Sequence, residues 1–192
     1  LPTGGQGPGD IREYQLASCL LDKVTQQTTI HVWLNRDALS DSVLSSLWER
    51  MNREGLKDLV MYDGCDTFVD FVQIALASLL LVCRRGEEIL GFIWVTDLIP
   101  DVRAEAHFCF FKQAWGTGAP GEAGRLAIDF LTGPEGFGVK VIHGKILDSN
   151  MSALEAVLRL GFEVVGHYYD GKNDLALVEL SGRRSSKLKA ES

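Results

Sequence analysis

A glycine-rich turn that leads into a helix is the feature of this sequence best suited to chemistry. Gln113 to Gly118 follows the strand-like run Ala106 to Phe111, and Gly121 to Leu126 continues it as a helix. Glycines let several backbone N–H groups point into one hollow, and a helix N-terminus adds roughly half a positive charge. This order predicts a phosphate or pyrophosphate site. Because glycine fills 20 of the 192 positions, a plain strand-to-helix connection is the alternative.

A second motif runs from Asp148 to Gly166. It predicts a capped helix that ends at Gly161 and is followed by a short apolar strand. Asn150 lies eleven residues before Gly161. Any of Asp148, Ser149 and Asn150 has a side chain that suits a helix N-cap.

Together and in this order, the two motifs resemble the GNAT superfamily of acyl-CoA N-acyltransferases. Gln113 to Gly118 matches that family's Gln/Arg-x-x-Gly-x-Gly/Ala loop, and Asn150 with Gly161-Phe162 matches its Asn helix and Leu-Gly-Phe ending. The run from Trp115 to Ala123 is most similar to the branch that acetylates ribosomal-protein N-termini. The resemblance implies an α/β (α+β) fold, with a mixed, largely antiparallel central sheet flanked by helices, and acetyl-CoA (CoA) as donor co-substrate.

By the same resemblance, the strand before the loop splays from its neighbour, and an amide near Phe108 or Phe110 is the expected oxyanion donor. For Asn150, a plain N-cap stays open as the alternative to a ligand role. Pro120 departs from the family loop; we expect it to delay the helix start and to remove one phosphate donor. The expected cofactor-binding residues are Phe108, Cys109, Phe110, Gln113, Trp115, Gly116, Thr117, Gly118 and Asn150.

Acetyl transfer to an amine needs a group that takes up the amine proton. Glu105 stands where the ribosomal-protein branch has the carboxylate of its Ala-Glu-Ile-Gly-Tyr motif, and it is the first candidate base. His107 lies two residues further, hence on the same face of the strand, and imidazole exchanges protons near neutral pH. A histidine among aromatic residues is also typical of a hydrogen-bonded core, so a structural role is the alternative.

Many members of the family protonate the leaving thiolate with a tyrosine seven residues after the Asn, where this chain has Val157. Tyr168 is the candidate replacement. Tyr168 and Tyr169 are adjacent on a predicted strand and point to opposite faces, so at most one can reach the pocket. Solvent is the other proton source, because a thiolate is a good leaving group.

The elements that position these residues form one predicted domain, 11–181, between a flexible tail at 1–10 and a basic flexible tail at 182–192. A helix from Ser40 or Asp41 to Gly55 and a second one capped by Asp66 follow the first strand. The expected strands are 28–34, 79–84, 89–96, 104–112, 139–146, 162–165 and 175–180, and the later helices are 122–131 and 150–160.

Composition excludes several classes of protein. The apolar run Ile74 to Cys83 is too short for a membrane span, and the net charge of −7 disfavours nucleic-acid binding. The four cysteines are scattered and the histidines isolated, which predicts no metal site and a reduced, cytoplasmic protein. The acidity favours cationic acceptors, with ordinary solubility charge as the alternative.

The sequence therefore predicts an acetyl-CoA-dependent N-acetyltransferase for a primary amine, either a protein N-terminus or a small molecule. A catalytically silent GNAT domain that binds CoA or serves as a scaffold is the alternative, favoured by Val157 and Pro120. A Rossmann-type nucleotide-binding domain ranks last, because no acid closes the strand after the loop before Asp148. Whether two copies pair as a homodimer is left open.

Overall fold

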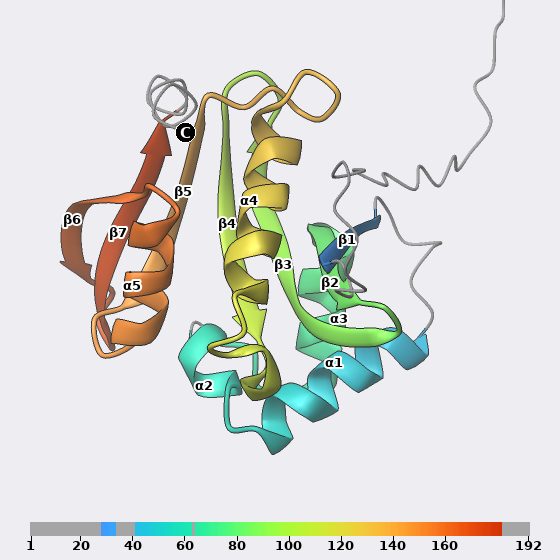
Figure 1. Ribbon diagram of the computed structural model, residues 1–192. Coiled ribbons are helices and arrows are strands. Elements are labelled where there is room, and N and C mark those ends of the chain that lie inside the picture. The colour runs from blue at the N-terminus through green and yellow to red at the C-terminus, as the bar shows by residue number, and fades with distance from the viewer. Residues whose placement is uncertain (1–27, 34–40, 63, 182–192) are drawn as a thin grey trace, which may run out of the picture.

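A seven-stranded sheet runs through the computed structural model, which describes residues 28–33, 41–62 and 64–181 (Figure 1). Its order is β1-β2-β3-β4-β5-β7-β6, and every neighbouring pair is antiparallel except β4 with β5. The predicted fold class is confirmed. The strands are β1 Thr28–Trp33, β2 Leu79–Arg85, β3 Glu88–Ile99, β4 Arg103–Phe110, β5 Val141–Leu147, β6 Glu163–Tyr169 and β7 Asp174–Ser181.

Helices cover both faces of this sheet. On one face, α1 (Asp41–Arg53), α2 (Lys57–Val60) and α3 (Phe68–Ala77) bury an apolar cluster with β2 and β3. On the other face, α4 (Ala119–Thr132) packs against β1 to β4, and α5 (Met151–Arg159) covers the half that contains β5 and β7 (Figure 1). Burial on both faces explains why β2 and β3 are nearly continuous apolar runs.

The pairing of β4 with β5 is unusually short. It covers only Arg103, Ala104 and Glu105, which face Val141, Ile142 and His143. β4 continues to Phe110 and β5 to Leu147, so the two strands diverge beyond Glu105. Gly144 lies at this point, where a Cβ would come within 2.9 Å of the Ala106 carbonyl oxygen. The sheet thus splits between its two central strands, each half with its own helix.

Two local predictions were wrong, and one short helix was missed. The cap of α3 is Thr67, whose hydroxyl accepts from the Asp70 amide in a reciprocal capping box, and Asp66 lies one residue outside. The four-residue helix α2 was not predicted, because it has no side-chain cap. Pro120 does not delay α4, which begins at Ala119 with Gly118 as N-cap, since proline fits the first turn of a helix.

The first strand begins at Thr28, as predicted. The two expected tails, 1–10 and 182–192, lie outside the described residues, as do residues 11–27 of the expected domain.

Candidate active site

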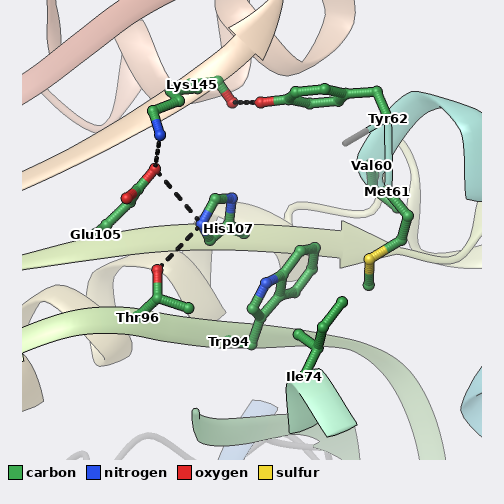
Figure 2. A pocket seen from close by; sticks show the side chains of 9 residues that line it. All are labelled: Val60, Met61, Tyr62, Ile74, Trp94, Thr96, Glu105, His107 and Lys145. Carbon is green, nitrogen blue, oxygen red and sulfur yellow. Dashed lines mark hydrogen bonds and ion pairs between the residues drawn. The ribbon is translucent and has the colours of Figure 1, made fainter. Parts of the chain in front are cut away.

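A cavity of about 190 Å³ opens on the α1–α3 face of the sheet, beside the point where β4 and β5 diverge. Its lining joins apolar side chains of the helices to polar side chains of three strands (Figure 2). The lining residues are Val60, Met61, Tyr62, Ile74, Trp94, Thr96, Glu105, His107 and Lys145.

The centre of this pocket is the carboxylate of Glu105. Its Oε1 lies 2.9 Å from Lys145 Nζ and 3.7 Å from His107 Nε2, and its Oε2 lies 3.8 Å from His143 Nε2. The Glu105 side chain is only 13% exposed. Oε1 is shielded from solvent, and its ion pair with Lys145 lacks the alignment of a hydrogen bond. One carboxylate is therefore surrounded by three basic side chains from β4 and β5.

His107 is held in a fixed orientation beside Glu105. Its ring stacks on Trp94 with centroids 5.0 Å apart and planes 11° apart, and its Nε2 lies 3.3 Å from Thr96 Oγ1. The sheet register explains both contacts, because Trp94 faces His107 and Thr96 faces Glu105 across β3 and β4. The prediction that Glu105 and His107 share one face is confirmed by their place in the same cavity.

Tyr62 bridges the diverging strands. It follows α2, which packs against β4, and its hydroxyl donates to the Lys145 carbonyl oxygen of β5 over 3.2 Å (Figure 2). That carbonyl lies beyond the last paired residue of β5, where β4 no longer offers a donor. A phenol thus stands at the rim of the pocket next to the gap in the sheet.

The free edge of β4 provides the amides expected for the donor. The Phe111 amide donates to Leu90 of β3, so by antiparallel alternation the amides of Phe108 and Phe110 point away from β3, toward β5. Cys109 differs from both, since it pairs with Phe92 and its thiol is buried in the cluster under α1–α3. Burial raises the pKa of this thiol to about 12.

The glycine loop turns as predicted. From Trp115 to Ala119, every second backbone amide donates a hydrogen bond within the loop. Gly116 and Gly118 have φ of 74° and 82°, and no atom lies within 4 Å of a Cβ placed on either. The amides of Trp115, Thr117 and Ala119 donate within the loop, to Lys112, Ala114 and the Thr117 hydroxyl. Within the described part of the chain, no acceptor is found for the amides of Gly116 and Gly118. These two are the donors that the loop offers.

Three polar side chains that were expected to bind the cofactor form hydrogen bonds within the protein. Trp115 is 51% exposed, and its Nε1 donates to the Phe110 carbonyl oxygen over 2.8 Å, which closes the loop onto the end of β4. Gln113 donates to the Ile89 carbonyl oxygen over 3.3 Å. Asn150 caps α5, where its Oδ1 accepts from the Ala153 amide over 3.2 Å. This contact is the N-cap role that the sequence left open.

Tyr168 is not brought into the pocket. It lies on β6, the outer strand, with β5 and β7 between it and β4, and it is not among the residues that line the cavity. The sequence suggested it from its nearness to Gly161-Phe162, but β6 pairs outside β7. Val157 is buried in the apolar cluster beneath α5 with Ile146 and Val178.

Sequence reasoning missed Lys145, Tyr62 and Thr96. Lys145 had a usable signal, because alternation along the predicted strand 139–146 puts it on one face with His143. Tyr62 had none, since the short α2 that precedes it has no side-chain cap and no periodicity.

Two absences hold for residues 28–33, 41–62 and 64–181. No helix there is long and apolar enough to cross a membrane. No group of three or more His, Cys, Asp and Glu side chains in these ranges is arranged to hold a metal ion.

Comparisons with solved structures agree with this fold. No curated protein matches the sequence significantly. Among solved structures, a spermidine N-acetyltransferase from Vibrio cholerae in complex with CoA and spermine superposes with a TM-score of 0.65 at 14% identity, covering 83% of this chain and 98% of that one. The aminoglycoside acetyltransferase AAC(6')-Ib in complex with coenzyme A gives 0.68 at 14% identity, with 85% and 99% covered. A GNAT-family acetyltransferase from Bacillus anthracis gives 0.63 at 10%, with 80% and 95% covered.

These likenesses, each far below 25% identity, show the shared fold. The sequence itself matches the model of the acetyltransferase (GNAT) domain over residues 27–163, which is well over half of the chain. The match spans the pocket, the glycine loop and α5. The chain therefore belongs to the GNAT acetyltransferase family.

Proposed function

We propose that this protein is an acetyl-CoA-dependent N-acetyltransferase that acts on the primary amine of a small molecule. The observation that carries the proposal is the place of the pocket. Glu105 and His107 lie where β4 and β5 part, so a thioester held in the gap would meet an amine held in the pocket.

The residues of the donor side fit CoA. The unengaged amides of Gly116 and Gly118 and the N-terminus of α4 suit a pyrophosphate, and open space at both glycines leaves room for it. The amides of Phe108 and Phe110 on the free edge of β4 suit the amide-bearing pantetheine arm and the thioester oxygen. For Asn150 we propose a cap role first, because its Oδ1 is engaged at α5.

On the acceptor side, Glu105 and His107 are the proposed proton acceptors. An amine enters as an ammonium and must lose a proton before its nitrogen attacks the carbonyl. This first proton passes to Glu105 or His107, after which the C–N bond forms and the C–S bond breaks. The nitrogen then loses a second proton to solvent, and the thiolate takes one proton. Tyr62 is the described phenol at the pocket that could give that proton, whereas Tyr168 lies on the outer strand.

Two further possibilities follow from the sequence. A protein N-terminus is the other acceptor class, which the resemblance of Trp115 to Ala123 to the ribosomal-protein branch suggests. A silent CoA-binding or scaffold domain is the other function, which Val157 favours because an apolar side chain fills the position of the family's tyrosine. A homodimer is compatible with either.

The test is a set of amines and peptides incubated with acetyl-CoA while free thiol is measured. Turnover of at least one small amine, lost in Glu105→Gln, supports the proposal. Turnover of peptides alone would move the acceptor to protein N-termini. CoA binding by calorimetry without turnover of any acceptor would establish the silent domain instead.

A further inference from the structure

The apolar side of the pocket carries a more specific inference about the acceptor, which rests on the proposed function. We infer that the acceptor is a small primary amine whose nitrogen is attached to an apolar group, such as an alkyl chain or an aromatic ring. The group binds against the apolar wall of the pocket, which is formed by Val60, Met61, Ile74 and Trp94.

The pocket has two chemically different sides. Polar side chains of β3, β4 and β5 lie on one side, with Glu105 and His107 among them, and the apolar wall lies on the other (Figure 2). Trp94 joins the two sides, because its indole stacks on the His107 ring with centroids 5.0 Å apart. An amine whose nitrogen lies beside Glu105 and His107 therefore extends its carbon atoms along the apolar wall.

The apolar wall keeps surface that a ligand can cover. Met61 and Trp94 belong to the apolar cluster under α1–α3 and are 5% and 4% exposed. Val60 and Ile74 pack against this cluster and are only partly buried by it, and both line the cavity. Covering such surface with an apolar group increases affinity about fourfold for each CH₂ that is buried. A polar group in the same place gains no such contribution.

The side chains of the wall also favour an apolar group over a polar one of equal size. Val60 and Ile74 end in aliphatic carbons, and the thioether of Met61 is a weak hydrogen-bond acceptor, so a hydroxyl against them would lose hydration without a strong partner among them. Met61 is unbranched and adapts to different apolar shapes, whereas Trp94 is fixed between His107 and Phe92. The cavity of about 190 Å³ limits the acceptor to a small molecule.

A matched series of acceptors tests the inference. Butylamine and 3-aminopropan-1-ol have the same length and differ only in a terminal methyl or hydroxyl group, and 2-phenylethylamine carries an aromatic ring instead. We expect kcat/KM for the better of the two apolar amines to exceed that for 3-aminopropan-1-ol by about 10- to 100-fold, the range over which an apolar pocket selects against a hydroxyl.

Variants of the apolar wall then assign the effect to its side chains. Val60→Thr and Ile74→Thr each place a hydroxyl among the apolar groups, and each should reduce the preference for the apolar amine about 3- to 10-fold. The kcat/KM for 3-aminopropan-1-ol should not fall. Val69→Thr is the matched control, because Val69 is 62% exposed on the same helix as Ile74 and is not among the lining residues. Its preference should equal that of wild type, and circular dichroism verifies that each variant folds.

The inference is overturned if 3-aminopropan-1-ol is as good an acceptor for wild type as the apolar amines. It is also overturned if folded Val60→Thr and Ile74→Thr both keep the wild-type preference. If both variants fail to fold, the comparison of acceptors on wild type decides alone.

Absence of turnover with every amine would sink the proposed function separately. In that case calorimetric titration of wild type with butylamine and 3-aminopropan-1-ol, with CoA present, decides the preference of the pocket. Tighter binding of butylamine would support the inference. Equal or weaker binding of butylamine, or no binding of either amine, would overturn it.

Discussion

The Glu54 carboxylate accepts a hydrogen bond from the Lys112 amide over 2.6 Å, which ties the end of α1 to the start of the glycine loop. Arg50 reinforces the junction, because it pairs with Glu54 over 2.8 Å, donates to the Ile89 carbonyl oxygen and lies 4.2 Å from the centroid of the Phe111 ring. The end of α1 and the start of the glycine loop are thus held by one small polar cluster.

Replacing Glu54 should weaken this junction. Glu54→Gln removes the charge and presents an NH₂ group to Arg50, so we expect a loss of about 1–3 kcal/mol in the free energy of unfolding. Urea denaturation measures it. Glu49→Gln on α1, where an exposed carboxylate accepts from Ser45, is the matched control and should change stability by less than about 0.5 kcal/mol. Equal losses in the two variants would show that the junction adds nothing.

The same carboxylate gives stability a pH dependence. Burial pushes the pKa of Glu54 upward, but hydrogen bonds from Arg50 and the Lys112 amide and the charges of Arg50 and Arg53 outweigh it, so the pKa is lowered from 4.5. A carboxylate lowered by folding stabilises fully above its unfolded pKa and loses this contribution as pH falls through its folded pKa. The stability difference between wild type and Glu54→Gln should therefore shrink below pH 4.5. A difference that is constant down to about pH 3 would contradict the assignment.

The role of the glycine loop in CoA binding can be tested by comparison with another turn of similar backbone strain. Gly116→Ala and Gly118→Ala place a Cβ at φ of 74° and 82°, which costs about 1–2 kcal/mol each and fills the space proposed for the pyrophosphate. Gly86→Ala in the β2–β3 turn, at φ of 59° with nothing within 4 Å, has similar strain far from the loop. Calorimetry should show CoA affinity falling only in the loop variants. If Gly86→Ala lowers affinity equally, the effect is global strain.

Activity measurements can distinguish the role of Glu105 from that of other carboxylates. Glu105→Gln should lower kcat about 100-fold, the lower range for loss of a general base, with CoA affinity unchanged. Glu155→Gln breaks an exposed ion pair with Arg159 on α5 and should keep full activity. An active Glu105→Gln would leave His107 as the base, and His107→Ala would then carry the loss.

The described cysteines should not react with the reagent in a thiol assay. Burial raises the pKa of Cys83 and of Cys109, in the latter to about 12, and Cys65 is buried as well. Thiolate is the reactive form, so none of the three should react with a thiol reagent at mildly alkaline pH until the chain unfolds. Fast labelling of any of them, located by peptide mass spectrometry, would show that this part of the core opens in the native state.

The sequence predicted much of the fold because its strongest signals are local. Gly116 and Gly118 require positive φ, and the structure has it at both. Thr67 was passed over for Asp66 because either residue suits a cap, and only the reciprocal bond with Asp70 decides between them.

Only part of the pocket was predicted, because its residues come from segments that lie far apart in the sequence. Glu105 and His107 share a strand, so alternation alone places them together. Alternation places Lys145 on one face with His143, but it reaches Glu105 because β4 and β5 pair in parallel for three residues, and sequence spacing does not predict which distant strands pair. Tyr168 lies outside the cavity because nearness in sequence to Gly161-Phe162 says nothing of the strand order β5-β7-β6.

The indole of Trp115 closes the loop onto the Phe110 carbonyl while half of its surface meets solvent. Its fluorescence should report occupancy of the neighbouring amides, because a phosphate beside it changes the polarity that the ring senses. Subtracting the emission of a Trp115→Phe variant isolates this signal from the remaining tryptophans. Rapid-mixing experiments can then time the arrival of the nucleotide end without any label.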